Sequence, residues 1–423
     1  MPVHISHSIA IWSFRVAAPA SFSTASVRAA SVRRSLRGHT ANVAAHAAVG
    51  SRFGLVEGNC VQREPIPGVD AHDGDEVVLV ARGIATAVAP EGGLTDVQAE
   101  LLSAIADALT GVTVDYRCLD PLGPDELADV LAARDMDYRQ RIVHHMVLGE
   151  LVLRPLPPAV AHRVATYADV LGVQDDFVRV ARRYAQGAHG LAWLDLRRSG
   201  FVDAQGDAAQ AAPGTSRRPD PFVAQEDPAL AERWASFAEL PPESLGRSVW
   251  ELYDGRGFTL PGAPGGAPAY LAQHDFVHVL ADYGTNLKGE LEVFSFIGRA
   301  NPDPKGFAWL ATLIGLFETG FIRDTGFFER DVRERNLQAP GMQLRVADAI
   351  RRGKVVCQRL DRDLFEVDYY SLVERPVPEV REILFFPPKS PRALECGSPG
   401  AFDLEGMSEL QRQVLAQGRR VPS

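Results

Sequence analysis

The stretch "HDFVHVLADYGTNLKGE", residues 274–290, decides how the C-terminal part of this chain is expected to fold. Its first half belongs to a helical apolar pattern that ends at Gly284, where glycine can take the left-handed conformation of a helix C-terminus. Thr285 or Asn286 can then cap a second helix, because short polar side chains accept hydrogen bonds from the free N–H groups of a first turn. The stretch therefore predicts a helical hairpin.

The polar side chains of this hairpin have the types and spacing of metal ligands. His274 and His278 are four residues apart and share one helix face. In a single continuous helix, Glu290 would point about 160° away from His274, so only the chain reversal brings it close. Two imidazoles and a carboxylate suit zinc or another borderline divalent ion. Asp275 is expected as a fourth ligand or as an acceptor that orients an imidazole. The alternative is a pair of ordinary buried histidines.

The same four residues form the pattern H-D-x-x-H, eleven residues, then E, which resembles the signature of the Coq-four family of coenzyme Q (ubiquinone) biosynthesis. Upstream, "LPPESLGRSVWELY" (240–253) resembles the entry helix of that family. Downstream, "DAIRRGKVVCQRLDRDLFEVDYYSLVERPVPEVREIL" (348–384) resembles its closing region. The resemblance covers about residues 226–388, with three separated motifs in the same order.

This resemblance implies a mostly helical fold and a bound zinc or other divalent metal ion. The implied ligands are His274, Asp275, His278 and Glu290. It also implies binding of a polyprenylated quinone precursor or isoprenoid lipid. The implied activity is metal-dependent removal of the C1 carboxylate of a prenylated hydroxybenzoate, with oxidation there, as a decarboxylase or lyase. The alternative is a non-catalytic lipid-binding scaffold for other quinone-biosynthesis proteins, with a structural metal. The segment "YLAQ" (270–273) differs from the basic residues that the family carries before the motif, which affects binding of an acidic substrate.

The preceding part of the chain, residues 75–198, is expected to form a helical bundle. In "LTDVQAELLSAIADAL" (94–109), Thr95 is the expected N-cap, and amphipathic helical patterns with Pro, Gly or Asp breaks follow. The run "DEVVLVARGIATAV" (75–88) is interpreted as β-like. The predicted architecture is therefore mostly α, with two successive helical domains.

One part of the bundle carries a second resemblance. "YRQRIVHHMVLGELVLRPLPPAVAHRVATYADVLGV" (138–173) is similar to the TerB family of tellurite resistance, but it lacks the acidic pair of that family. No metal site is therefore expected there, and His144 and His145 are interpreted as structural. A docking, sensory or stress-response role of this bundle is a further alternative.

The remaining segments are assigned by composition. The first 56 residues contain six arginines and no Asp or Glu, so residues 1–74 are interpreted as an extension that is a transit-like or disordered segment, or misassigned upstream sequence. Residues 199–225 are the expected linker, 226–390 the metal-binding domain and 391–423 a tail with one short helix. The apolar run 307–322 is expected to be a buried helix or the wall of a groove for a prenyl tail.

Composition excludes some functions. A net charge of −10 without a basic stripe argues against nucleic-acid binding. No apolar stretch reaches the roughly 20 residues of a confident membrane span. Four cysteines, far apart in the sequence, are expected to be reduced thiols. These features favour a cytoplasmic protein; peripheral contact with the inner face of the membrane and formation of an oligomer stay open.

Overall fold

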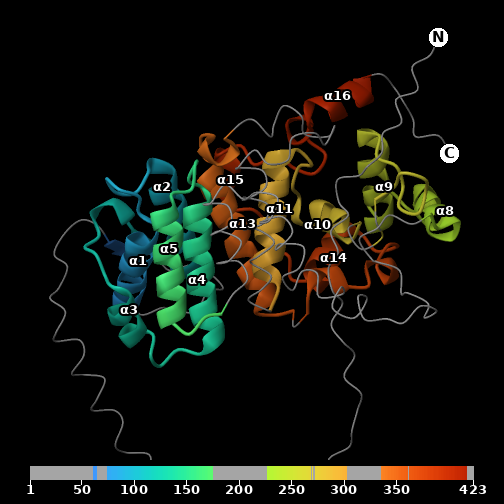
Figure 1. Ribbon diagram of the computed structural model, residues 1–423. Helices are drawn as coiled ribbons and strands as arrows, with labels where there is room; N and C mark the ends of the chain where they lie inside the picture. Colours follow the sequence, from blue (N-terminus) through green and yellow to red (C-terminus); the bar gives the residue numbers. More distant parts are fainter. Residues whose placement is uncertain are drawn as a thin grey trace, which may run out of the picture.

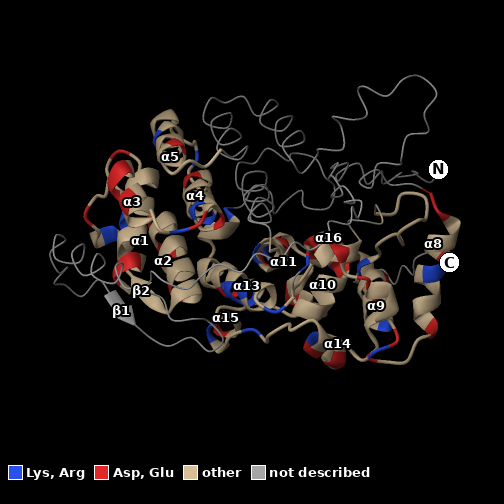
Figure 2. Cartoon of the chain, turned by 90° about the horizontal axis from the view of Figure 1, so that it is seen from below, with Lys and Arg blue, Asp and Glu red and all other residues tan. Residues whose placement is uncertain are grey.

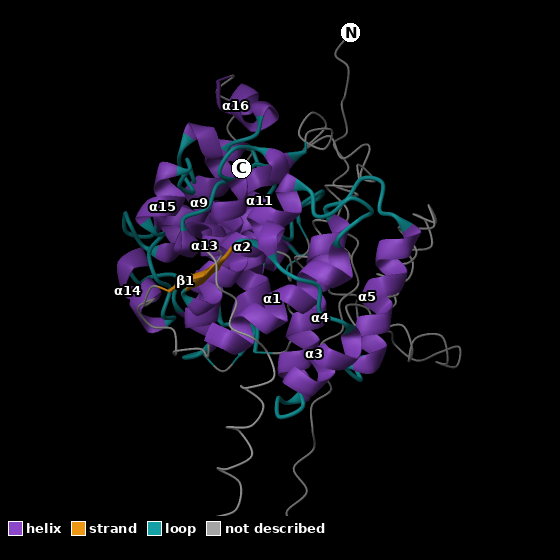
Figure 3. Ribbon diagram, turned by 90° about the vertical axis from the view of Figure 1, so that its left-hand side faces the viewer, coloured by secondary structure: helices purple, strands orange, loops and turns teal. Residues whose placement is uncertain are grey.

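A computed structural model describes residues 61–63, 74–174, 226–267, 269, 272–302, 335–360 and 362–416. This part of the chain is mostly helical, as predicted, and its one small antiparallel sheet joins two short strands (Figure 3). The α-helices are α1 (Gly74–Val88), α2 (Asp96–Thr110), α3 (Pro124–Val130), α4 (Met136–Leu151), α5 (Pro158–Val170), α8 (Pro228–Ser236), α9 (Leu245–Arg256), α10 (Gln273–Ala281), α11 (Leu287–Ala300), α13 (Met342–Cys357), α14 (Val377–Ile383), α15 (Pro391–Glu395) and α16 (Glu409–Ala416). The strands are β1 (Val61–Arg63) and β2 (Val112–Val114). Single 3-10 turns are η1 (Tyr116–Cys118), η3 (Phe237–Glu239), η7 (Asn336–Gln338), η8 (Leu364–Glu366), η9 (Tyr369–Ser371) and η10 (Leu404–Gly406).

Helices α11 and α13 occupy the centre of the molecule. Figure 1 shows α1–α5 on one side of them and α8–α10 on the other, and Figure 2 shows the same order from below. Helix α13 packs against α11 on one side and α2 on the other, and one cluster of buried apolar residues continues through both parts. Polar contacts cross the same boundary: Lys354 Nζ donates to the Leu109 carbonyl over 2.9 Å, and Arg141 Nη2 donates to the Pro302 carbonyl over 2.8 Å.

Helix α2 begins and ends where its sequence predicts. The side chain of Thr95 accepts from the backbone N–H of Gln98, and the Gln98 side chain accepts from the backbone N–H of Thr95. This reciprocal capping box satisfies two donors of the first turn. Gly111 ends the helix with a φ of 71°, in the left-handed region that glycine adopts without a steric penalty. The predicted N-cap at Thr95 is confirmed.

The interpretation of residues 75–88 as β-like is wrong, because this segment is helix α1. Val77, Ala81, Ile84 and Val88 are buried at spacings of four, three and four residues, which places them on one helix face. That face packs on α3, α4 and α5. The β-branched residues favoured a strand in isolation, but burial of this apolar face against three helices outweighs a local preference that is worth only tenths of a kcal/mol to about 1 kcal/mol per residue.

The expectation of four reduced thiols is wrong for Cys118, which is disulfide-bonded. Cys357 and Cys396 are free. The four cysteines are far apart in the sequence, and their spacing did not indicate this bond. Spacing alone cannot indicate which cysteines the tertiary structure brings together.

The C-terminal segment contains α15 in addition to α16, the one helix expected there. Within the described residues, no helix is both long and apolar enough to cross a bilayer. The apolar run 307–322, the linker 199–225 and the first 60 residues lie outside the described residues, so the interpretations of these segments stay predictions.

Candidate metal centre

The predicted hairpin is present, but its first arm ends earlier than expected. Helix α10 ends at Ala281, and the left-handed residue that follows is Asp282, with a φ of 61°, rather than Gly284. Aspartate tolerates this conformation better than most residues with a side chain because its short carboxylate can hydrogen-bond locally. Here Asp282 Oδ1 accepts from the Ala401 backbone N–H over 3.0 Å, so the C-terminal tail supports the cap.

Gly284 is required for close packing rather than for a left-handed backbone. A Cβ at Gly284 would lie 2.4 Å from Cα of Gly406 in the tail, and a Cβ at Gly289 would lie 1.9 Å from the Gly284 carbonyl oxygen. The two glycines let three backbone segments pack together at the turn. The Gly406 carbonyl accepts from the backbone N–H groups of Thr285 and Asn286, over 2.7 and 2.8 Å. The tail therefore closes the hairpin, a role that sequence reasoning missed.

Asn286 is the residue that caps the second arm, one of the two alternatives that the sequence left open. Its side chain accepts from the Gly289 N–H over 2.9 Å, and its Nδ2 donates to the Glu405 carbonyl over 2.8 Å. The Glu290 N–H donates to the Asn286 carbonyl over 2.9 Å. This capped first turn of α11 fixes where Glu290 lies relative to the histidines of α10.

The structure brings all four predicted site residues together. His278 Nε2 lies 3.3 Å from Glu290 Oε1, and His274 Nε2 lies 3.8 Å from Glu290 Oε2. Asp275 Oδ1 lies 3.7 Å from His274 Nε2, and one ligand atom from each of His274, Asp275 and His278 falls within 4.8 Å of the others. The first three residues thus form a group that could hold a metal ion, and Glu290 of the second helix lies beside both imidazoles.

His278 directs an acceptor towards the carboxylate. Its Nδ1 lies 3.3 Å from the Tyr283 carbonyl, which favours the tautomer with the proton on Nδ1. Nε2 then carries a lone pair and faces Glu290, yet Nε2 of His278 and Oε2 of Glu290 are buried without a hydrogen-bond partner in the described structure. The oxygen that faces Nε2 at 3.3 Å is Oε1, and an imidazole lone pair that faces a carboxylate oxygen requires a cation or a proton between them.

Burial and the neighbouring carboxylates shift the pKa of His278 in opposite directions. Burial lowers the pKa of this imidazole, but the charges of Glu290 and Asp275 and the contact with Tyr283 outweigh burial, so that the pKa is raised overall. A proton and a metal ion would therefore compete for the same Nε2 lone pair, and metal affinity is expected to fall as the pH falls.

Asp275 serves two neighbours with its two oxygens. Its Oδ2 accepts from the Tyr253 hydroxyl of α9 over 2.6 Å, while Oδ1 faces His274. Burial, followed by the charge of Asp275, raises the pKa of Tyr253 well above its usual value, so the phenol stays a donor. Burial also lowers the pKa of Arg256 to about 10, which the charge of Asp275 partly offsets. This arrangement suits either a ligand or an orienting acceptor. Tyr253 was missed as a contributor although it ends the quoted segment 240–253.

His274 is the most accessible of the four residues. Its side chain is 17% exposed, compared with 8% for Asp275 and Glu290 and none for His278. The His274 ring stacks on Phe294 of α11, with 5.4 Å between ring centroids. A ligand from solvent would therefore approach along the side of the site where His274 lies, while Phe294 is buried beneath its ring.

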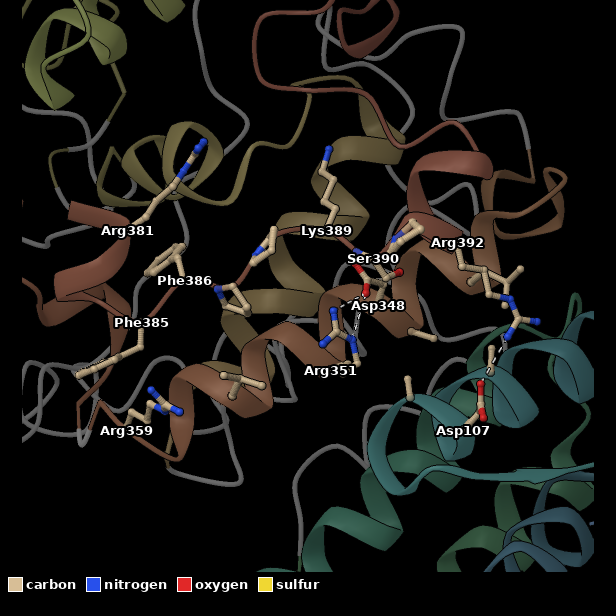
Figure 4. A pocket seen from close by; sticks show the side chains of 18 of the residues that line it. Asp107, Asp348, Arg351, Arg359, Arg381, Phe385, Phe386, Lys389, Ser390 and Arg392 are labelled. Carbon is tan, nitrogen blue, oxygen red and sulfur yellow. Dashed lines mark hydrogen bonds and ion pairs between the residues drawn. The ribbon is translucent and has the colours of Figure 1, made fainter. Parts of the chain in front are cut away.

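A groove with a volume of about 980 Å³ lies elsewhere, between α2 and the segment α13–α15. None of the four candidate metal ligands lines this groove. Figure 4 shows two ion pairs there: Arg351 Nη2 with Asp348 Oδ1 at 2.8 Å, and Arg392 Nη1 with Asp107 Oδ2 at 3.4 Å. Intramolecular carboxylates already neutralise these two cations.

The adjacent histidines of α4 lie in the packed part of the bundle. His144 is 1% exposed. Burial lowers the pKa of His145 to about 3, and the charges of Arg299 and Arg141 and the neighbouring His144 act in the same direction, only partly offset by a backbone hydrogen bond from this imidazole. His145 is therefore expected to be neutral in the folded protein at neutral pH, which agrees with the structural role predicted for this pair.

We expect the chain to lose stability in mild acid through His145. Between pH 6.5 and about 3 the unfolded chain binds a proton that the folded chain does not, so the free energy of unfolding falls by up to about 1.4 kcal/mol per pH unit as the pH drops. Urea denaturation at several pH values should give a shallower pH dependence for His145→Gln. His162→Gln, at an exposed position of α5, should keep the wild-type slope; equal slopes for all three proteins would contradict the prediction.

No protein-family model, curated protein or solved structure matches this chain. The resemblances of residues 226–388 and 138–173 therefore stay hypotheses, and they enter the functional argument only through the residues that carry them.

Proposed function

We propose that the hairpin of α10 and α11 binds one divalent metal ion, with zinc as the first candidate. The proposed ligands are His274, Asp275, His278 and Glu290. The observation that supports this most strongly is that His278 Nε2, which lies 3.3 Å from Glu290 Oε1, is buried without a hydrogen-bond partner, as is the other carboxylate oxygen, Oε2. Mixed nitrogen and oxygen donors of this kind suit zinc.

The neighbouring residues hold these donors in place. The Tyr283 carbonyl orients the imidazole of His278, and the Tyr253 hydroxyl orients the carboxylate of Asp275. Such partners of metal ligands keep the lone pairs directed at one point. Burial of three of the four side chains excludes water from most of the site, and the partly exposed edge at His274 leaves an approach for a substrate.

For the reaction, we propose that the chain acts on a polyprenylated hydroxybenzoate-type precursor of a quinone and removes its C1 carboxylate. The proposal rests on the resemblance of the H-D-x-x-H…E pattern. When bound, the ion would act as a Lewis acid on a carboxylate or phenol oxygen. A prenyl chain on the substrate would bring the protein to the membrane surface.

Metal content measured by mass spectrometry tests the first step. We expect about one zinc ion per chain in the wild-type protein, by the one-ion geometry of such ligand sets. His278→Ala should lose it, and Glu290→Gln, which keeps the shape of the side chain, should bind it at least about tenfold more weakly. His162→Ala on α5 removes an exposed histidine far from the hairpin in sequence and should keep the full content.

Circular dichroism on each variant separates loss of metal from loss of fold. A wild-type protein without stoichiometric metal, or folded His278→Ala and Glu290→Gln variants that keep it, would rule out the metal centre. If metal is bound, incubation with prenylated 4-hydroxybenzoate and detection of the decarboxylated product test the reaction. Retention of isoprenoid lipid together with bound metal but no turnover would favour the non-catalytic scaffold.

A further inference from the structure

A second cavity, with a volume of about 450 Å³, lies where α1, α2 and α4 meet the last turns of α11 and α13. Its walls are largely apolar and include Val77, Val80, Ile84, Leu102, Ile105 and Ile142. Its remaining lining includes four basic side chains: Arg141, His145, Arg299 and Lys354. Pockets for small ligands commonly have this volume and this combination of apolar walls with a few polar groups.

Two of these basic groups have a buried nitrogen without a hydrogen-bond partner among the described residues. Nη1 of Arg141 and Nη1 of Arg299 are buried and have no hydrogen-bond partner in the described structure. Arg141 uses its Nη2 on the Pro302 carbonyl, at 2.8 Å. Neither guanidinium forms an ion pair with a described carboxylate, in contrast with the paired Arg351 and Arg392 of the larger groove.

The two guanidinium groups also repel each other. Burial and, to a smaller extent, the charge of Arg141 lower the pKa of Arg299 to about 10 in spite of an opposing contribution from Cys357. Two aspartates line the cavity, but both are exposed, and Asp135 already accepts from the Tyr138 N–H as the cap of α4. The negative charge of the cavity thus lies at its solvent side, and the positive charge at its buried side.

This distribution of charge is unfavourable unless an anion enters. Buried charges are ordinarily paired, and an unpaired one is costly because it has lost its hydration. Guanidinium groups match carboxylate and phosphate oxygens with two parallel hydrogen bonds. The apolar walls along α1 and α2 would cover the hydrocarbon part of the same molecule and remove it from water.

We propose that this cavity binds a small amphipathic anion, with its carboxylate or phosphate head at Arg299 and Arg141 and its hydrocarbon body along α1 and α2. The site is separate from the metal centre, since none of the four candidate metal ligands lines it. It is formed jointly by the bundle α1–α5 and by α11 and α13, so an occupant contacts both parts of the chain.

Calorimetric titration of the full chain tests the proposal with four probes. Decanoate and decyl phosphate carry the proposed head and body, decanol carries the body alone, and inorganic phosphate carries the head alone. We expect the wild-type protein to bind at least one of the two amphipathic anions at least tenfold more tightly than decanol or phosphate. Arg299→Met should weaken that binding at least tenfold. Arg359→Met is the matched control, because Arg359 lines the larger groove instead and its loss should leave the affinity unchanged.

Thermal unfolding of the ligand-free proteins shows whether Arg299→Met is folded; its Tm should equal or exceed that of the wild type, because an unpaired buried charge has been removed. Tighter binding of decanoate or of decyl phosphate identifies the head group. Equal affinity for decanol and decanoate would show an apolar pocket only and overturn the proposal. The proposal would also be overturned if Arg299→Met bound the amphipathic anion as tightly as the wild type does. The same holds if only Arg359→Met weakened that binding. None of these titrations depends on metal. A negative result here therefore does not bear on the proposed metal centre, and a protein without metal does not bear on the proposed anion site.

Discussion

Replacing Arg345 with methionine is expected to lower the free energy of unfolding by about 3–5 kcal/mol, because a buried charge is left without its partner. Arg345 Nη2 lies 2.5 Å from Glu292 Oε2, and its Nε lies 3.1 Å from Glu292 Oε1. The Ser398 hydroxyl donates to the same Oε1 over 2.5 Å. The Glu292 side chain is fully buried and that of Arg345 is 8% exposed, so water cannot replace the lost contact. Urea denaturation measures the change.

Two further variants decide whether this loss reflects an unpaired charge. The double variant Arg345→Met/Glu292→Leu should recover most of the stability, since replacing both members of a buried pair with apolar residues is often close to neutral. Arg375→Met breaks an exposed pair with Glu379 and should cost less than about 1 kcal/mol. A double variant as unstable as Arg345→Met would show that packing, rather than charge, explains the effect.

Replacing Gly353 with alanine is expected to destabilise the protein by about 3 kcal/mol, the upper part of the usual range for overpacking. A Cβ at Gly353 would lie 2.3 Å from the Phe296 carbonyl oxygen and 2.9 Å from the Ala300 nitrogen. Both atoms are backbone atoms of α11, so no side chain can move aside, and α11 and α13 must separate. Thermal and urea unfolding should both show the loss.

Gly255→Ala provides the matched control. Gly255 lies in α9, and a Cβ there would meet no atom within 4 Å. Because alanine has the higher helix propensity, this substitution should stabilise the protein by about 0.5–1 kcal/mol. Two glycine-to-alanine changes in helices should therefore have opposite signs. A loss in Gly255→Ala similar to that in Gly353→Ala would contradict the explanation by backbone contact.

Features that depend on neighbouring residues in the sequence were predictable. The capping box of Thr95 and Gln98, and the cap of α11 at Asn286, are each formed within four residues. The meeting of His274 and His278 with Glu290 could be predicted too, because a short turn leaves two helices few ways to pack. The β-like interpretation of α1 failed because a run of β-branched residues fits a strand or a buried helix until its packing partners are known.

Features that depend on distant segments could not be predicted. The tail places Gly406 on the hairpin turn, which explains why Gly284 lacks a side chain. The disulfide of Cys118 and the cationic cavity likewise depend on residues brought together from distant parts of the chain. Nothing near Arg299 in the sequence indicates that its guanidinium would face that of Arg141.

The sequence by itself determined the helical class of this protein, the N-cap of α2 and the closeness of His274, His278 and Glu290, because hydrogen bonding and helix periodicity act over a few residues. The tertiary structure alone decided that Tyr253 orients Asp275, that the tail closes the hairpin and that two guanidinium groups without a carboxylate partner among the described residues line one cavity. Burial and electrostatic pairing depend on distances in space between residues that are far apart in the sequence, and these distances cannot be inferred from the sequence alone.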